Sequence, residues 1–309
     1  MRNSIEYQPK VSIIVPTYNE ILDVSKCLES LLKLSYKNVE LIFVDSNSTD
    51  GTKEYLKERA REGKIKLIKE EERKGVSSAR NIGVNSSSGE ILVILNADVI
   101  LPEDFIEKIL PHYGEGAGFV VCNSCVENQQ YLFPRWMQAR HLLQYSNNDN
   151  IVWSEGFSCL KSALIDIGLF PLEFAANTSG EDAIFGENLE RKYKKVTDRS
   201  IVVKHFAPVR LKEIFRQRLG RGRGTPYLYK YAKSLELKEI FKFLIGETLL
   251  EILFLMTLVV FLIKAWKASS KSERGRKDFI PFLFMEIFDS FIQVIGEWEA
   301  FFELYRKTK

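Results

Sequence analysis

The sequence predicts an α/β protein in which a mostly parallel, Rossmann-like sheet is flanked by helices and followed by a hydrophobic, amphipathic helical region. Short β-branched runs alternate with helical patterns from Val11 to about residue 125, and the strand-like runs are almost wholly apolar. After residue 224 the composition changes to long apolar, aromatic-rich stretches. We therefore predict one domain over residues 1–224 and a C-terminal helical region over residues 225–309.

The predicted elements follow in order along the first half of the chain. Apolar β-branched runs predict strands at 11–15, 39–44, 65–68 and 91–95, and apolar residues at helical spacing predict helices at 21–34, 52–60 and 77–85. Polar clusters follow three of the strands, at 16–20, 45–50 and 96–98. Ligands of parallel sheets bind at the carboxyl ends of the strands, so we expect the functional residues there.

Composition and charge exclude several classes of protein. The 44 Lys and Arg residues nearly balance 41 Asp and Glu residues, so charge gives no reason to expect a nucleic-acid partner. A hydrophobic fraction of 45% excludes wholesale disorder. Four Cys residues in 309 do not form a disulfide scaffold and suit a reducing compartment. The first ten residues lack an apolar stretch, so we expect no secretory signal.

Asp45 ends the second predicted strand, where a carboxylate can accept hydrogen bonds from a nucleotide base or a ribose hydroxyl. The segments 16–20 and 45–52 are also compatible with ordinary turns and helix caps. The first strand is not followed by a G-x-G-x-x-G motif, so we do not expect a dinucleotide cofactor. Arg80 lies on the third helix, where it could pair with strand-end acids or a phosphate, or face solvent.

Asn96-Ala97-Asp98 ends the fourth predicted strand. Because the outer residues are two positions apart, their side chains lie on one side of an extended segment, and oxygen ligands so placed suit Mg²⁺ or Mn²⁺ bridging a diphosphate. A simple turn before Pro102 is the alternative. His205 follows another strand-like run; such a residue is usually structural, but as a ligand beside Asp98 it would favour Mn²⁺.

Two further motifs lie in the middle of the chain. Glu181-Asp182 begins a helical stretch, where acids are favoured by the helix dipole, and a general base for an acceptor hydroxyl is the functional alternative. The segment 210–223 has six cations against one acid. Its Arg-rich run at 216–223 is predicted to face a membrane, to bind a diphosphate through Arg221 and Arg223, or both. Glycines within and beside it predict a mobile backbone.

Five motifs in order resemble glycosyltransferase family 2 over about residues 10–224: VSIIVPTYNE at 11–20, VDSNSTDGT at 44–52, SARNIG at 78–83, LNAD at 95–98 and GED at 180–182. The resemblance implies a GT-A fold and inverting transfer of a sugar from a UDP- or GDP-sugar. It implies that the donor is bound by Pro16, Thr17, Tyr18, Glu20, Asp45, Asn47, Arg80, Asn96, Ala97 and Asp98.

By the same resemblance, Asp182 is the catalytic base with Glu181 beside it, Asp98 stands at the D-x-D metal motif, and His205 matches a histidine that joins the metal in some members. The chain departs from the family at Asn96, which replaces the first acid of D-x-D and removes one negative charge near the metal. The Q-x-x-R-W motif of processive synthases is absent, which favours single additions over polymer extrusion.

The C-terminal region has two apolar stretches, 243–263 and 279–304, separated by a basic segment at 264–277. If both stretches spanned a membrane, the basic segments 210–223 and 264–277 would lie on opposite sides of it, against the positive-inside tendency. We therefore favour monotopic attachment to the cytoplasmic face of the membrane over spanning, and we expect a glycan or polyprenyl-linked acceptor. A helical pair buried in a homodimer is a third arrangement.

Two other functions remain open from the sequence. A sugar nucleotidyltransferase shares this kind of sheet but needs a glycine-rich phosphate loop near the N-terminus, which Pro16-Thr17-Tyr18 does not provide. A membrane-bound scaffold with a degenerate site is the non-enzymatic alternative, and Asn96 is the one feature that favours it.

Overall fold

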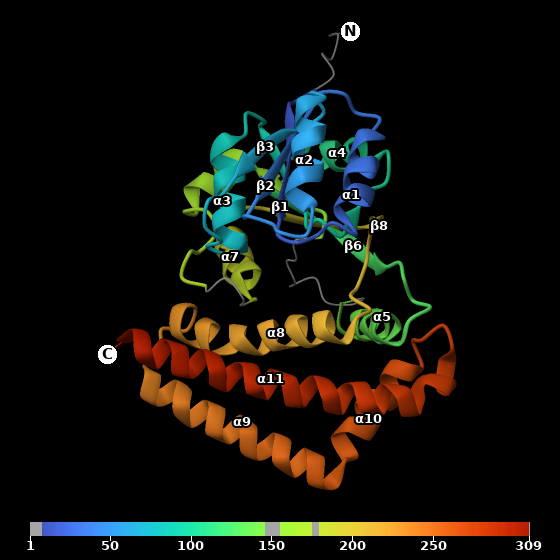
Figure 1. Ribbon diagram of the computed structural model, residues 1–309, viewed down its shortest axis with the longest axis vertical. Coiled ribbons are helices and arrows are strands. Elements are labelled where there is room, and N and C mark those ends of the chain that lie inside the picture. The colour runs from blue at the N-terminus through green and yellow to red at the C-terminus, as the bar shows by residue number, and fades with distance from the viewer. Residues whose placement is uncertain (1–7, 146–154, 175–178, 309) are drawn as a thin grey trace. The chain divides into compact units, whose positions relative to one another are not determined.

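The computed structural model describes residues 8–145, 155–174 and 179–308, and the chain forms two compact units (Figure 1). The first, here called the sheet unit, comprises Met1–Cys125, Val152–Leu172 and Phe185–His205. The second, the helical unit, comprises Val126–Ile151, Glu173–Ile184 and Phe206–Lys309. The domain boundary predicted after residue 224 falls within helix α8 (Leu211–Tyr231) of the helical unit, and it stays a prediction about where the catalytic residues end.

The described part of the sheet unit contains one mixed sheet of eight strands in the order β3-β2-β1-β4-β7-β6-β8-β5. The first four strands are parallel, as the sequence predicts, whereas β7 is antiparallel to β4 and β6, and β5 is antiparallel to β8. The strands are β1 (Val11–Thr17), β2 (Val39–Asp45), β3 (Lys66–Lys69), β4 (Ile91–Ile94), β5 (Val99–Ile100), β6 (Phe119–Val126), β7 (Phe157–Leu160) and β8 (Lys195–His205).

Helices cover both faces of this sheet because the central strands are apolar on both sides. Val11, Ile13 and Val15 of β1 join a core with α1, α2 and α4, while Ile14 joins the opposite core with α3 and α6. This two-sided burial explains why the strands are continuous apolar runs in the sequence. The helices are α1 (Val24–Leu32), α2 (Thr52–Arg61), α3 (Val76–Ser86), α4 (Phe105–Gly114), α6 (Lys161–Asp166) and α7 (Glu181–Glu190), the last shared between the units.

The helical unit is built around α11, which lies between α8 and α9 (Figure 1). Its other elements include one helix that precedes β7 and β8 in the sequence and a pair of helices that meet at a sharp bend. They are α5 (Leu132–Tyr145), α8 (Leu211–Tyr231), α9 (Leu237–Thr257), α10 (Val259–Ser269), the 3-10 helix η1 (Gly275–Asp278) and α11 (Phe279–Thr308).

The glycines of the basic segment lie inside a helix, and Gly222 lies where two helices touch; a mobile backbone there stays a prediction. All three, at positions 220, 222 and 224, lie inside α8. A Cβ atom at Gly222 would overlap the carbonyl of Gln293, and one at Gly296 would overlap the carbonyl of Leu219. The backbones of α8 and α11 therefore touch at this crossing, and glycine is required for close approach.

Two segments of the helical unit are apolar and long enough to cross a membrane. Together, η1 and α11 form one candidate, and α9 with α10 forms a second only if the pair counts as one span across its 78° bend. The two acids within the apolar stretch of α9 are hydrogen-bonded inside the unit: Glu247 accepts a hydrogen bond from Tyr229 (2.8 Å) and Glu251 accepts one from Ser290 (2.6 Å). These two acids of α9 therefore take part in the packing between helices.

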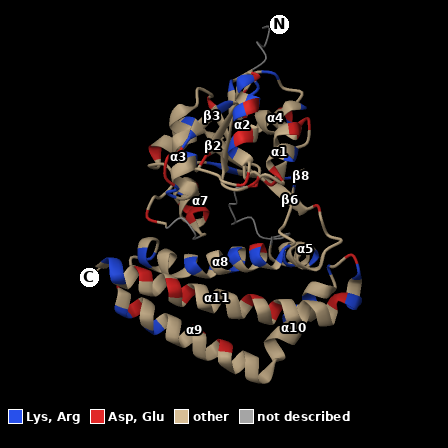
Figure 2. Ribbon diagram, viewed as in Figure 1, with Lys and Arg blue, Asp and Glu red and all other residues tan. Residues whose placement is uncertain are grey.

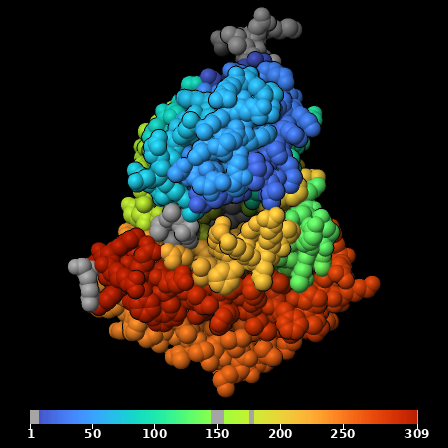
Figure 3. All heavy atoms as spheres, viewed as in Figure 1, coloured from blue at the N-terminus to red at the C-terminus, as the bar shows by residue number. Residues whose placement is uncertain are grey.

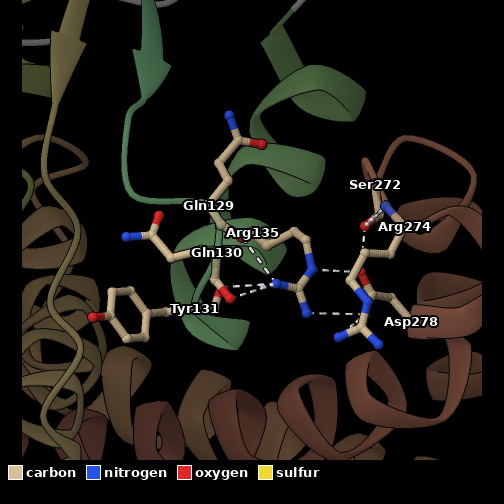
Figure 4. A network of polar contacts seen from close by, with 7 residues as sticks. All are labelled: Gln129, Gln130, Tyr131, Arg135, Ser272, Arg274 and Asp278. Atoms are coloured by element: carbon tan, nitrogen blue, oxygen red, sulfur yellow. Dashed lines mark hydrogen bonds and ion pairs between the residues drawn. The ribbon is translucent and has the colours of Figure 1, made fainter.

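A buried ion pair fastens η1 to α5 (Figure 4). The guanidinium of Arg135 donates to both oxygens of Asp278, through Nε (2.6 Å) and one Nη (3.1 Å), and its other Nη donates to backbone carbonyls of residues 129–131. Both side chains are almost fully buried. Because the pair is bidentate and the remaining donors are satisfied, it can exist away from water.

Candidate active site

The carboxyl ends of β1 and β2 lie side by side, because the two strands are parallel and place Thr17 opposite Asp45. Asp45 is fully buried, and its carboxylate accepts a hydrogen bond from the backbone N–H of Ser48 (3.1 Å) while Thr17 Oγ1 lies 3.5 Å from it. Asp45 therefore stands at the strand end where the sequence predicts a carboxylate that receives a base. Its contact with a base stays a prediction.

The loops that follow these two strands are fastened together. The backbone N–H of Asn19 donates to Ser48 Oγ and that of Glu20 donates to Thr52 Oγ1, both at 2.9 Å. Asn19 and Asn47 have φ values of 58° and 59°, in the left-handed region that asparagine tolerates better than most residues. The two loops thus form a fixed lip at this edge of the sheet, directly after Pro16 in β1.

Two charged residues that the motifs do not indicate also lie at this edge. The guanidinium of Arg73 stacks over the ring of Tyr18, 3.9 Å from its centroid. Glu70 is buried and accepts hydrogen bonds from Ser46 Oγ and Ser78 Oγ, both at 2.6 Å. The charged run at 69–74, directly after a predicted strand, is the sequence feature that could have identified them.

Arg80 of α3 reaches the end of β4. Its buried guanidinium donates a hydrogen bond to Asn96 Oδ1 (3.1 Å) and lies over the ring of Phe170, 5.2 Å from the centroid. Because Asn96 is neutral, this hydrogen bond does not neutralise the guanidinium as an aspartate would. The asparagine therefore changes the charge balance next to Ala97 and Asp98.

Asp98 lies beside His205, because β5 pairs with β8 and places Val99 opposite His205. Asp98 Oδ1 and His205 Nε2 are both buried and have no hydrogen-bond partner among the residues that the structure describes. The other ring nitrogen of His205 is 2.9 Å from Ser124 Oγ and 3.3 Å from the carboxylate of Glu155. A histidine fixed through Nδ1 presents Nε2, which is the usual arrangement of a metal-binding imidazole.

The surroundings of Asp98 favour a cation. Burial raises the pKa of Asp98 to about 7; His205 opposes this rise, whereas Glu20, Glu155 and Asp23 reinforce it. A buried carboxylate among other acids is stabilised by a positive charge, and carboxylate oxygen with imidazole nitrogen suits Mn²⁺ better than Mg²⁺. The described residues contain no group of three or more His, Cys, Asp and Glu arranged to hold a metal. Asp98 and His205 therefore fit a metal whose remaining ligands come from substrate or water.

The predicted catalytic acids belong to a different unit from the predicted metal ligands. Asp182 is half-buried and Glu181 is buried, both in the first turn of α7, and both belong to the part of α7 in the helical unit. The segment before them is attached to α8, because the backbone N–H of Ser179 donates to the carbonyl of Gly220 (3.1 Å). Their catalytic roles stay predictions.

The two arginines predicted to bind a diphosphate differ from each other. Arg221 is exposed on α8, whereas Arg223 forms ion pairs with Glu299 (3.2 Å) and Glu303 of α11. The charge of Arg223 is therefore neutralised within the helical unit to a greater extent than that of exposed Arg221. The contact of either arginine with a diphosphate stays a prediction.

Comparisons with known sequences point to one family. Residues 12–170 match the family described as Glycosyl transferase family 2. The glycosyltransferase GlyG of Streptococcus pneumoniae is 31% identical over 112 residues, which cover 36% of this chain and 37% of that protein. The GalNAc(5)-diNAcBac-PP-undecaprenol beta-1,3-glucosyltransferase of Campylobacter jejuni is 27% identical over 177 residues, 55% of this chain and 57% of its own length. The chain thus spans less than two thirds of these relatives.

Solved structures show the same fold. The mannosyltransferase PcManGT of Pyrobaculum calidifontis, in complex with GDP-Man and Mn²⁺, has a TM-score of 0.62 at 20% identity, covering 96% of this chain and 88% of that one. The S. aureus protein TarS, residues 1–349, has a TM-score of 0.52 at 14% identity, covering 97% and 92%. Together with the motifs at the strand ends, the family match over more than half of the sequence leads to one conclusion: the chain belongs to glycosyltransferase family 2.

Proposed function

We propose that this chain is a membrane-associated, inverting glycosyltransferase that moves a sugar from a UDP- or GDP-sugar to a hydroxyl of a glycan or lipid-linked acceptor. The observation that carries the proposal is a pair of buried atoms at the carboxyl edge of the sheet, Asp98 Oδ1 and His205 Nε2, for which the described part of the chain provides no hydrogen-bond partner. A divalent cation held there would neutralise charge on the diphosphate as it leaves.

The chain's own residues have distinct roles in this proposal. Tyr18 and Asp45 receive the base, and Arg80 faces the nucleotide. The carboxylate of Asp182 takes the proton from the acceptor hydroxyl as its oxygen attacks the anomeric carbon. The bond from that carbon to the diphosphate breaks on the opposite face, so the configuration inverts, and Arg221 meets the departing charge.

The acceptor and donor classes are proposed from the relatives. The Campylobacter relative is named for a substrate linked to undecaprenol through a diphosphate, which supports a polyprenyl-linked acceptor. We propose that the chain meets this acceptor at the cytoplasmic face of a membrane. The similar structures hold GDP-Man, UDP or UDP-GlcNAc, so both UDP- and GDP-sugars belong in the test.

Metal-dependent hydrolysis of a panel of UDP- and GDP-sugars, read as released diphosphate, tests the reaction class. A nucleotidyltransferase would instead release pyrophosphate from a nucleoside triphosphate and a sugar phosphate. A scaffold would turn over neither set, and that result would overturn the proposal.

The substitution Asp182→Asn tests the base. We expect the rate of transfer to fall by about 10²–10⁴-fold with little change in donor affinity, because an amide cannot take the proton. Transfer kinetics and donor titration by calorimetry measure the two effects. Glu187→Gln is the matched control, since Glu187 lies on the same helix and pairs with Arg191 at the surface. Normal transfer by Asp182→Asn would mean that another group is the base.

A further inference from the structure

The pair α9–α10 of the helical unit is sharply bent at one residue. Leu258 joins the two helices with φ of 54° and ψ of −5°, and their axes form an angle of 78°. Figure 1 shows the resulting V, whose vertex points away from α8 and α11. A leucine in the left-handed region is energetically unfavourable, so the bend is held by its surroundings rather than by local preference.

The outer face of this V is apolar. Between positions 243 and 263 the only charged residues are Glu247 and Glu251, which bond to groups inside the unit. The vertex is free of charge in Figure 2, and the orange atoms taper to it in Figure 3. The exposed large apolar side chains of this segment are Phe243, Ile245, Leu249, Leu250, Ile252, Leu253, Met256, Leu258, Val259, Leu262 and Ile263.

Packing inside the unit does not account for these side chains. On α10, Phe261 and Ala265 are fully buried against the rest of the unit, whereas Leu262, Ile263 and Trp266 face outward. Met256, next to the vertex, is 80% exposed. A continuous apolar surface of this kind marks an interaction site, because soluble proteins seldom expose one.

Cations follow directly after the apolar face. Six exposed Lys and Arg residues lie in 264–277 with one exposed acid, Glu273, while Asp278 is buried against Arg135. The guanidinium of Arg276 stacks on Trp266, 3.5 Å from its centroid, and the indole ring is half exposed. Tryptophan beside cations is typical of the boundary between acyl chains and headgroups. The six cations are Lys264, Lys267, Lys271, Arg274, Arg276 and Lys277.

The positive charge of segment 264–277 indicates which kind of partner covers the apolar face. A second copy of the chain would bring the same basic segment to the contact, and like charges would oppose association. Anionic lipid headgroups complement it, with each cation near the surface contributing about 1 kcal/mol. Lys238 and Lys242 at the start of α9 lie on the other arm of the V, so a vertex in the acyl chains leaves cations on both arms at the same side of the bilayer.

The apolar part of α10 limits the depth of the vertex to one leaflet. At 1.5 Å per residue, the five residues of α10 before Lys264 rise about 8 Å, which is less than half of the roughly 30 Å hydrocarbon thickness. The apolar helix α11 does not span in this arrangement, because it packs on α8, whose Arg218 and Arg223 pair with Asp289 and acids of α11. Crossing by α11 would carry this charged helix into the hydrocarbon.

We propose that α9 and α10 form a re-entrant wedge, inserting the vertex at Leu258 into one leaflet of an anionic bilayer, with the cations of 264–277 on the headgroups. This inference deepens the proposed membrane attachment and rests on it. It names the inserted residue, the depth of one leaflet and the sign of the lipid charge.

Flotation of the purified full chain with liposomes tests the wedge. Wild type should bind vesicles of phosphatidylcholine with phosphatidylglycerol at least 10-fold more tightly than vesicles of phosphatidylcholine alone. Leu258→Asp should weaken binding by about 50-fold or more, since an aspartate inside the hydrocarbon is costly, while the backbone is preserved because aspartate tolerates the left-handed conformation. Ile165→Asp, at an exposed apolar position of α6, is the matched control and should bind like wild type.

Each of the remaining outcomes would overturn one part of the wedge. Equal binding by Leu258→Asp and wild type overturns insertion at the vertex, and equal binding to both vesicle types overturns the role of the cations. A chain that ignores vesicles but forms a dimer that Leu258→Asp dissociates shows that a second copy covers the face. Nucleotide-sugar hydrolysis by Leu258→Asp should match wild type; loss of hydrolysis by wild type itself, with vesicle binding intact, would refute the proposed function alone.

Discussion

Two buried acids of the helical unit form ion pairs with arginines, whereas two buried polar atoms at the strand ends of the sheet unit have no partner among the residues that the structure describes. In the helical unit Asp289 pairs with Arg218, and Asp278 pairs with Arg135. At the edge of the sheet, Asp98 Oδ1 and His205 Nε2 are buried without a hydrogen bond to any described residue. A buried polar group without a partner costs free energy, so the comparison separates groups that hold the fold from groups kept for a ligand.

The largest expected effect comes from Asp98→Asn. Metal-dependent hydrolysis of the donor should fall by about 10³-fold, because the neutral amide is a poorer ligand for a divalent ion. Without metal, the free energy of unfolding at pH 8 should not fall, since the substitution removes a charge that burial disfavours. Steady-state kinetics and urea unfolding in EDTA measure these effects.

A second readout of the same substitution is independent of turnover. Mn²⁺ should raise the melting temperature of wild type and leave that of Asp98→Asn unchanged, because only a folded site binds the ion. If Asp98→Asn were instead strongly destabilised in EDTA, Asp98 would be a structural residue and the comparison would fail.

Breaking a pair in the helical unit should have the opposite signature. Arg218→Met leaves Asp289 buried and uncompensated, so we expect the free energy of unfolding to fall by about 3–5 kcal/mol. Urea unfolding in a mild detergent measures this loss.

The double substitution Arg218→Met with Asp289→Leu is the matched control. It should recover to within about 1–2 kcal/mol of wild type, because apolar side chains of similar volume replace a buried ion pair at little cost. A double variant as unstable as the single one would show that the pair has a role beyond neutralising its own charges.

The smallest effect should come from a carboxylate of the sheet unit that does have partners. Glu40 is desolvated, but hydrogen bonds from Ser12 and Ser88 and the charge of Lys10 outweigh this and lower its pKa to about 2. The ionised form therefore stabilises the fold above its ordinary pKa of about 4.3, and this contribution is lost as the pH falls from about 5 towards 2.

Glu40→Gln should accordingly cost about 1–2 kcal/mol at pH 7, and the difference from wild type should shrink by pH 3. Urea unfolding at the two pH values measures it. A cost independent of pH would mean that shape rather than charge matters at this position.

The sequence predicted the parallel half of the fold well, because its signals are local. The strands β1, β2, β3 and β4 and the helices between them were confirmed to within a few residues, since apolar runs buried on both faces and strand-end polar clusters are visible in the chain itself. The antiparallel pairings of β7 and β8 were not predicted, because they join segments distant in sequence.

Motifs in the sequence predicted part of the candidate site, and contacts between distant residues revealed the rest. Asp45, Asn96, Asp98 and His205 were predicted from spacing and resemblance, and their roles stay predictions. Glu155 was missed, although it lies 3.3 Å from His205, because no pattern around it indicates a partner 50 residues away.

The crossing of α8 and α11 at Gly222 and Gly296 has a consequence for tracing ancestry. A single methyl group at either position would force the two backbones apart, so the pair can change only if both helices shift together. These two positions can therefore be used to sort homologues that align with this chain over the sheet unit alone. Homologues with glycine at both positions are candidates for having inherited the same helical unit. Homologues with bulky residues there have a different packing of these helices, whatever sugar they transfer.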